Sequence, residues 1–488
     1  MDEKIVPDTG NNKKARGGNV KIYRLIVAAC FILYTSMMCA KSVFTAELVT
    51  FIDKMHTDKF NASLCNTYYF ITYAAVQVIL APFMGRINVR RYLVITVPLA
   101  AVCGILVAFI GDVKQAWVLF AFTGAFQAGI YAGCMYILSL YLPSHMLPFA
   151  NSLMQSGFAI GNTLAYCVSA LFVSLSLWTL PYIIFGVLFL LAVVFFGIVT
   201  RKAAEIFPDA GKHRRAAAGQ RKAAAGGDEI TDGAINDGES VCESVDKVNA
   251  TGDGKGRQSE LSYNKGLFTL KNGAQRVLFY GLSIAYSILV TTLFYAINNW
   301  VGNFFKEVYD LPDSVSIVIS LIVPIMTFFG PFIAISLSKK RKNYIKSAVV
   351  AVFVPLAAAL ALVFFYDAGI IVAMLLIAVF IVGTKVLTGF QSVATFDMRT
   401  EINAGSYSAM VNAAASVSAA LAPTVMGKII DAANAAGSTG QEGWVAQYGC
   451  AAGISAATFL FLLLCFAFTR KKTNLNGVKN KRNKGERD

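Results

Sequence analysis

The chain has 488 residues, of which 56% are hydrophobic, and its net charge is +15. Its mean hydropathy of +0.58 is too high for an ordinary soluble protein, whose apolar content is nearer to about 45–50%. Apolar runs of about 20 residues, each long enough to cross a bilayer, recur along the whole length. These runs are continuous rather than alternating, so they argue against a transmembrane β-barrel. The sequence therefore predicts an all-α polytopic membrane protein.

Twelve transmembrane helices are predicted, in two groups of six. The first group covers about 22–52, 63–85, 91–111, 114–142, 148–174 and 178–200. The second group covers about 274–305, 314–338, 344–366, 369–396, 403–430 and 444–469. Two six-helix bundles are thus expected at 22–200 and 274–469. A tail at 1–21, a connector at 201–273 and a basic tail at 470–488 surround them.

The connector at 201–273 is the one long stretch that is not apolar. It is rich in Gly, Ala and charged residues and nearly free of aromatic residues. Such a composition cannot bury enough apolar surface to offset the entropy of ordering, so a flexible cytoplasmic connector is predicted. It contains no GxxxxGK[ST] motif, and ATP-driven transport is therefore not indicated.

Lysine and arginine gather in every second polar segment. They are concentrated in the two tails, in the connector, after the second helix and after the eighth, whereas the alternate loops are short and mildly acidic. This bias predicts that both termini are cytoplasmic in an integral membrane protein, with the plasma membrane as the expected location. The charge is explained by topology and does not indicate a nucleic-acid partner. The nine cysteines form no CxxC or His/Cys cluster, so no metal site, cofactor or disulfide framework is expected.

Two basic loops carry a resemblance to a known family. Residues 85–91 (GRINVRR) follow the second helix, and residues 339–342 (KKRK) follow the eighth. With six plus six helices and a central cytoplasmic loop, the chain resembles the major facilitator superfamily, although the family's Asp is absent from both loops. The resemblance implies a gating loop and a central cavity lined by helices 1, 4, 7 and 10. The candidate gating residues are Gly85, Arg86, Arg90 and Arg91.

A finer resemblance lies in the seventh and eleventh helices. Residues 299–308 (NWVGNFFKEV), residues 404–406 (AGS) and the positions Asn412 and Asp431 resemble the organophosphate:phosphate antiporter branch. That branch typically carries Arg in helices 1 and 7. Here helix 1 carries Lys41, and helix 7 has no Arg in its membrane part.

Two lysines are predicted to lie near the middle of the membrane. Lys41 is centrally placed in the first helix and Lys385 in the tenth. A charge at this depth costs about 3 kcal/mol or more unless it faces water or a partner. Two ammonium groups facing one cleft repel each other unless an anion lies between them, so a carboxylate or a phosphorylated substrate is expected. The alternative is that a lysine snorkels or pairs with a structural carboxylate.

Polar side chains at helical spacing accompany the two lysines. Besides Lys41 and Lys385, the candidate substrate-binding residues are Tyr34, Gln127, Tyr131, Thr291, Tyr295 and Asn298. The same residue types also serve as interhelical hydrogen bonds, which is the alternative for each of them. Gly157 and Gly161 form a small face expected to let the bundles rock. Glu47 is expected at the outer end of the first helix, where it either takes a proton or has a role near the surface.

The function predicted is secondary active transport of a small organic anion by alternating access, with phosphate or a proton as the expected coupling ion. The alternatives are a proton-coupled exporter of other small molecules and a non-transporting membrane sensor. No Ser/His or Cys/His pair and no HExxH motif stands out in the apolar runs, so an enzyme is not expected. The protein is expected to be a monomer.

Overall fold

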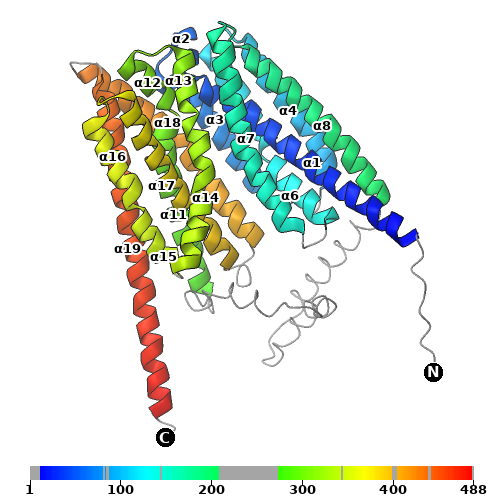
Figure 1. Cartoon of the computed structure of the whole chain (residues 1–488), viewed down its shortest axis with the longest axis vertical. Helices are drawn as coiled ribbons and strands as arrows, with labels where there is room; N and C mark the ends of the chain where they lie inside the picture. The colour runs from blue at the N-terminus through cyan, green and yellow to red at the C-terminus, as the bar shows by residue number, and fades with distance from the viewer. Residues whose placement is uncertain are drawn as a thin grey trace.

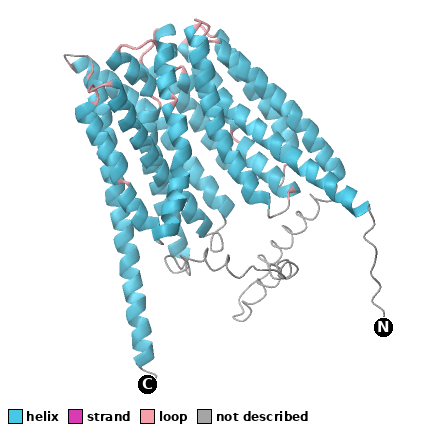
Figure 2. Ribbon diagram, viewed as in Figure 1, coloured by secondary structure: helices cyan, strands magenta, loops and turns pink. Residues whose placement is uncertain are grey.

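The computed structural model describes residues 11–80, 83, 87–142, 146–207, 273–341, 344–397, 404–437 and 441–485. These described residues are helical apart from short turns, and no strand occurs among them (Figure 2). The all-α fold predicted from the sequence is confirmed. Most of the predicted connector, residues 208–272, lies outside the described part of the chain.

The first half contains all six predicted helices, two of them interrupted. The first predicted helix is broken at Glu47 rather than continuous to residue 52, and the fourth is broken at Gly129. The elements are α1 (Asn11–Ala46), α2 (Leu48–Lys54), α3 (Lys59–Leu80), α4 (Val89–Leu106) with the 3₁₀ turn η2 (Val107–Phe109), α5 (Val113–Gln127), α6 (Ile130–Tyr141), α7 (Leu147–Ser174) and α8 (Leu180–Ile206).

The second half repeats this plan with more interruptions. The elements are α11 (Gly273–Asn298), α12 (Val301–Tyr309), α13 (Asp313–Ser320), α14 (Ile322–Arg341), α15 (Tyr344–Ala351), α16 (Phe353–Phe365), α17 (Ile370–Asp397), α18 (Ala404–Ala436) and α19 (Glu442–Gly485). Helix α19 runs well past the predicted end at residue 469. It ends on the same side of the bundle as the start of α1 (Figure 1).

Proline explains two of the interruptions. Helix α13 ends at Ser320, four residues before Pro324, and α15 ends at Ala351, four residues before Pro355. Proline has no N–H to donate to the carbonyl four residues earlier, and its ring crowds that carbonyl. Each pair of helices still forms one membrane crossing, at Asp313–Ala334 and Ile345–Phe365.

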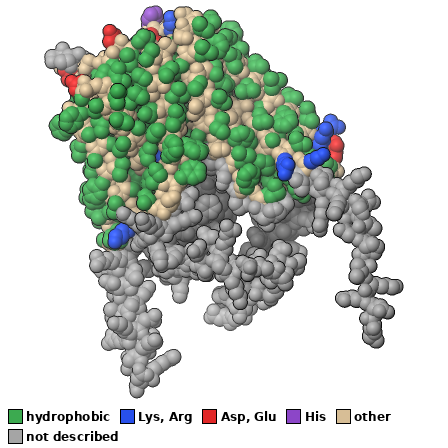
Figure 3. Space-filling view, in the orientation of Figure 1, with side chains coloured by type: hydrophobic (Ala, Val, Ile, Leu, Met, Phe, Trp, Pro, Cys, Tyr) green, Lys and Arg blue, Asp and Glu red, His purple; other side chains and the backbone are tan. Residues whose placement is uncertain are grey.

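Eleven helical stretches of the described residues are long and apolar enough to cross a membrane. Helix α3 is not among them, although it corresponds to a predicted crossing and has 22 residues. Asparagine, threonine and tyrosine are frequent along α3, which lowers its hydropathy. Large apolar side chains are exposed on many helices, and they cover the visible face of the bundle in Figure 3. This surface suits contact with lipid.

The two halves meet at several pairs of helices. Helix α3 packs against α18, and α7 packs against α13 and α14, whereas α1 packs against α7 and α8 within the first half. A side chain at Gly161 would lie 2.6 Å from Cβ of Met38, and one at Gly157 would lie 2.7 Å from Oγ1 of Thr35. The small face of α7 therefore meets α1 within one half.

Candidate substrate site and the charged end of the bundle

A cavity of about 50 Å³ lies between the two halves. Helices α1, α3 and α7 line it on one side, and α11 and α14 line it on the other. Its walls combine one lysine with amides, hydroxyls and aromatic rings. The lining residues are Lys41, Ser42, Thr45, Asn66, Phe70, Phe158, Asn162, Tyr166, Phe294, Tyr295, Asn298, Asn299, Val323, Pro324 and Thr327.

Lys41 is held over two aromatic rings of α3. Its Nζ lies 4.4 Å from the ring centroid of Phe70 and 5.4 Å from that of Tyr69. A ring face attracts a cation, but more weakly than a carboxylate does in a site removed from water. Lys41 forms no ion pair with any residue in the described ranges. Its charge is thus only partly compensated, and it remains available to an anion.

Lys385 reaches the same region from the second half. Its Nζ lies 3.2 Å from the ring centroid of Phe294, which lines the cavity, and it too has no ion pair within the described part of the chain. Lys385 is not among the residues that line the cavity, but it contacts Phe294, which is. It is near enough to Lys41 for the two charges to repel each other. One lysine from each half therefore approaches the cavity.

Two glycines bring Lys385 to this position. A side chain at Gly330 of α14 would lie 2.3 Å from Cβ of Lys385, and one at Gly389 of α17 would lie 2.5 Å from Cβ of Ala334. Backbone approach this close requires residues without a Cβ. The close packing of α14 on α17 therefore fixes the position of Cβ of Lys385.

Three other predicted residues lie at or directly behind the cavity wall. Tyr295 and Asn298 line it, and Nδ2 of Asn298 donates a hydrogen bond to Oδ1 of Asn299 at 2.8 Å. Gln127 is buried behind the wall, where it accepts a hydrogen bond of 2.7 Å from the Tyr69 hydroxyl. Gln127 therefore positions a ring under Lys41 rather than facing the cavity.

The remaining three predicted residues do not line this cavity. Tyr34 and Tyr131 pack against each other, with ring centroids 5.2 Å apart, and Tyr34 is buried in the core of the first half. Thr291 lies on α11 one helical turn from Tyr295, outside the set of lining residues.

The sequence did not point to most of the amides in the wall. Ser42 follows Lys41 directly and donates a hydrogen bond to Oδ1 of Asn162, and Asn66 lines the cavity from α3. Thr45 shares a helical face with Lys41 at spacing i+4, which the sequence shows, whereas Ser42 at i+1 lies on a different face and could not be found this way. Asn66 could not be found either, because its place in the wall depends on how α3 is rotated about its axis.

The predicted gating loop is described only in part. Gly85 and Arg86 lie outside the described residues. Asn88 caps α4 by accepting a hydrogen bond from the backbone N–H of Arg91 at 3.2 Å, and the preference for Asn at this position explains where the helix starts. Arg90 is partly buried and Arg91 is exposed at the start of α4.

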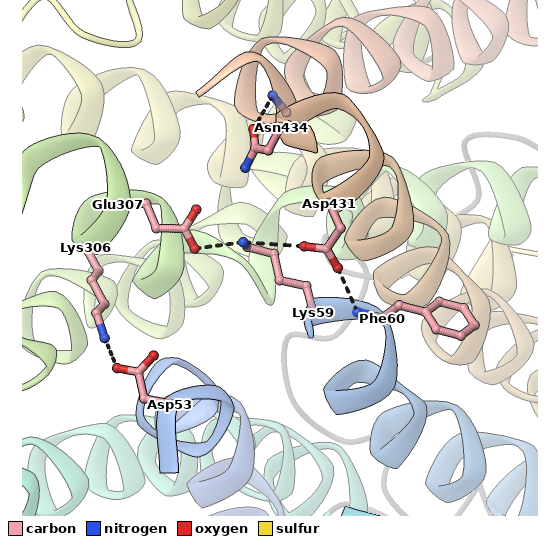
Figure 4. Close-up of polar contacts among 8 residues, drawn as sticks. Asp53, Lys59, Phe60, Lys306, Glu307, Asp431 and Asn434 are labelled. Carbon is pink, nitrogen blue, oxygen red and sulfur yellow. Dashed lines mark hydrogen bonds and ion pairs between the residues drawn. The ribbon is translucent and has the colours of Figure 1, made fainter. Parts of the chain in front are cut away.

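Ion pairs join the two halves at the end of the bundle that carries α2, α12 and α13 (Figures 1 and 4). Lys59 of α3 lies 2.8 Å from Oε1 of Glu307 and 3.5 Å from Oδ1 of Asp431, both from the second half. The backbone N–H of Phe60 also donates to Asp431, at 3.2 Å. The Lys59 side chain is only 12% exposed, so these pairs are partly shielded from solvent.

In a second set at the same end, the lysine comes from the second half and one of its carboxylate partners comes from the first. Lys306, from the second half, pairs with Asp53 of α2 and lies 2.8 Å from Oδ1 of Asp313. The Thr50 hydroxyl of α2 donates to Oδ2 of Asp313 at 2.8 Å. We call the six charged residues of the two sets the latch: Lys59, Glu307, Asp431, Lys306, Asp53 and Asp313. The latch joins the two halves at this end of the bundle.

Residues 29–423 match the model of the Major Facilitator Superfamily. This match spans most of the chain, and the fold, the two halves and the cavity between them agree with it. The chain therefore belongs to the major facilitator superfamily and is a membrane transporter. A comparison with curated protein sequences gave no match.

Solved structures of transporters share the fold. A bacterial homologue of the human lysosomal transporter Spinster, in an inward-facing and unoccupied conformation, is 14% identical with a TM-score of 0.63, covering 92% of this chain and 96% of that chain. The nucleoside transporter NupG is 14% identical with a TM-score of 0.59, covering 92% and 98%. The xylose transporter XylE from E. coli is 13% identical with a TM-score of 0.61, covering 91% and 97%. At these identities the similarity concerns the fold alone.

Proposed function

We propose that this transporter moves a small organic anion, a carboxylate or a phosphorylated metabolite, across the membrane by alternating access. The observation that carries the proposal is the pair Lys41 and Lys385, which approach one cavity from the two halves and form no ion pair with a described carboxylate. Unpaired charges at membrane depth are costly and are usually functional.

The aromatic rings explain how the two lysine charges are tolerated when no substrate is bound. Phe70 and Phe294 each offer a ring face to one lysine. An anion that enters between the ammonium groups removes their mutual repulsion and replaces a weak partner with a strong one. Lysine supplies point charges rather than the bidentate fork of arginine, so both carboxylates and phosphates suit the site. Tyr295, Asn298 and the amides beside them would hydrogen-bond the polar body of the substrate.

The other predicted residues receive indirect roles. Gln127 would act through the Tyr69 ring beneath Lys41. Tyr34, Tyr131 and Thr291 would meet the substrate in another state of the cycle, when the halves are arranged differently. The basic residues Arg90 and Arg91, with Gly85 and Arg86, would belong to the gate at the end opposite the latch.

We further infer that the latch end faces the outside, so that the state described is closed to the exterior. The lysine and arginine bias of the loops supports this orientation, with both termini in the cytoplasm of a plasma-membrane protein. Transport then requires the latch to open while the opposite end closes. Because each latch lysine pairs with at least one carboxylate of the other half, opening separates opposite charges at this end.

Counterflow in proteoliposomes containing only this protein tests the proposal. The panel is phosphate, glycerol phosphate, sugar phosphates, dicarboxylates and neutral sugars, with protein-free liposomes as the control. We expect saturable exchange of at least one anion and none of the neutral sugars. Exchange confined to the neutral sugars would favour a transporter of other small molecules. Absence of any flux in correctly folded protein would favour a non-transporting sensor.

A further inference from the structure

Glu47 occupies the break between α1 and α2 and is completely buried, with 0% of its surface exposed. It is the residue after the membrane-crossing segment Lys21–Ala46. Its backbone N–H still donates to the carbonyl of Val43 and its carbonyl accepts from Phe51, so the chain continues almost as one helix. Nothing in this backbone requires a carboxylate. The proposed binding of the anion does not use one here either.

The carboxylate belongs to a small group of buried polar atoms that lack partners. Neither oxygen of Glu47 has a hydrogen-bond partner in the described structure, and the same holds for Oγ of Ser169 and the hydroxyl of Tyr182. Ser169 of α7 and Tyr182 of α8 are buried close to the carboxylate, and the Ser169 hydroxyl lies at the margin of hydrogen-bond geometry with it. Buried polar groups are nearly always paired, so a fully buried carboxylate whose contact with Ser169 falls short of a regular hydrogen bond needs an explanation.

The chemistry of this group suits two protonation states. An ionised carboxylate accepts hydrogen bonds only, and the two hydroxyls can turn to donate to it. A protonated carboxyl group donates one hydrogen bond, and either hydroxyl oxygen can accept it. Away from water the uncharged form is favoured unless a cation offsets the lost hydration.

Among the described residues, no such cation pairs with Glu47. The elements packed around it carry these charged residues: Lys41 of α1, Asp53 and Lys54 of α2, Lys59 of α3, Lys306 and Glu307 of α12, and Asp313 of α13. Tyr166, Tyr182 and Cys65 are the other titratable groups named nearby. None of the described lysines forms an ion pair with Glu47, so its protonation depends on its access to water.

That access is controlled by the contact between the two halves. Ala46 and Val49, on either side of Glu47, form an apolar cluster with Tyr166 and Ala170 of α7 and with Ile317 of α13. Ile317 comes from the second half, so the cluster separates when the latch end opens. Tyr166 also lines the substrate cavity, which places the cavity on the other side of the same cluster. Water can thus approach Glu47 from one side or the other as the halves move.

We propose that Glu47 is a proton-binding site, lying outside the substrate cavity, through which one proton moves together with each anion. The carboxylate takes a proton from water when the latch end is open, and it releases the proton to water of the cavity when the opposite end is open. No other bond changes. This inference rests on the proposed anion transport, because coupling needs a transported substrate.

Proteoliposomes give the first test, with glycerol phosphate and succinate as probes. Uptake driven by an acid exterior is compared with exchange at equal pH for the wild type, Glu47→Gln and Glu47→Asp. Glu205→Gln, which removes an exposed carboxylate paired with Arg201, is the matched control. A gradient of about one pH unit stores about 1.4 kcal/mol per proton, enough for about tenfold accumulation. We expect the ratio of driven uptake to exchange to fall by about this factor in Glu47→Gln only, with partial recovery in Glu47→Asp.

A second measurement does not need a substrate. Infrared spectra of the purified wild type near neutral pH should contain a protonated-carboxyl band that is missing from Glu47→Gln and present in Glu205→Gln. The proposal is overturned if this band is unaffected by Glu47→Gln, or if a wild type that exchanges an anion shows no response to the pH gradient. If no anion is exchanged at all, the proposed function fails, while the infrared result still decides whether Glu47 holds a proton.

Discussion

The exposure of the latch residues allows an estimate of how far a latch substitution shifts the conformational equilibrium of the transport cycle. Lys59 lies 2.8 Å from Glu307 and 3.5 Å from Asp431, with its own side chain 12% exposed and its partners 29% and 31% exposed. Fully exposed pairs contribute about 0–1 kcal/mol, and breaking a fully buried pair costs about 3–5 kcal/mol. Because the exposure of this cluster is intermediate, Lys59→Gln should remove about 1–3 kcal/mol of stabilisation from the state in which this end is closed. A loss of this size shifts a two-state equilibrium by about 5–150-fold toward the state in which this end is open.

Spin labels on the two halves would measure this shift. Lys114 at the start of α5 and Asp367 after α16 are exposed positions at the latch end, one in each half. In a background without reactive native cysteines, the distance distribution of Lys59→Gln should gain a longer component. Lys54→Gln, which removes an exposed lysine from α2 with no ion pair to a described residue, is the control and should match the wild type. Identical distributions for Lys59→Gln and the wild type would refute the latch.

Two further substitutions test how the site is positioned. Gly330→Ala places a Cβ against Lys385 and should destabilise the protein by about 1–3 kcal/mol, lowering its melting temperature and its anion flux, whereas Gly281→Ala, with no neighbour within 4 Å, should do neither. An unchanged melting temperature in Gly330→Ala would show that α14 and α17 are not tightly packed. Tyr69→Phe leaves the buried Gln127 amide without its donor and should cost about 1–3 kcal/mol in thermal unfolding. A cost near zero would mean that Gln127 finds another partner.

The sequence determined the fold well because membrane-spanning helices leave a strong signal. Continuous apolar runs and the placement of Lys and Arg identify crossings without any knowledge of packing. The breaks within the membrane-spanning helices were harder to predict. Those before Pro324 and Pro355 follow from a proline rule that could have been applied, whereas the break at Glu47 has no local cause in the sequence.

The candidate site was predictable only where charge was involved. Lys41 and Lys385 stand out because a charge in an apolar run is costly wherever it points. The neutral wall residues Asn66 and Phe158 carry no such cost, so their place depends on helix rotation, which the sequence does not specify. The latch was missed for a related reason: Lys59 lies near the end of a helix, where charges are ordinary, and its partners are more than 200 positions away in the chain.

The central claim is that Lys41 and Lys385 bind a transported anion together, and counterflow of lysine variants tests it most directly. Truncating one partner of a desolvated charge contact costs about 2–5 kcal/mol, or at least about 30-fold in affinity. We expect Lys41→Gln and Lys385→Gln each to lose anion exchange by at least about this factor, with partial retention in the arginine variants. Lys428→Gln, an exposed lysine 5.7 Å from the Phe60 ring at the latch end, should exchange like the wild type. Exchange that survives in both Lys41→Gln and Lys385→Gln would contradict the account.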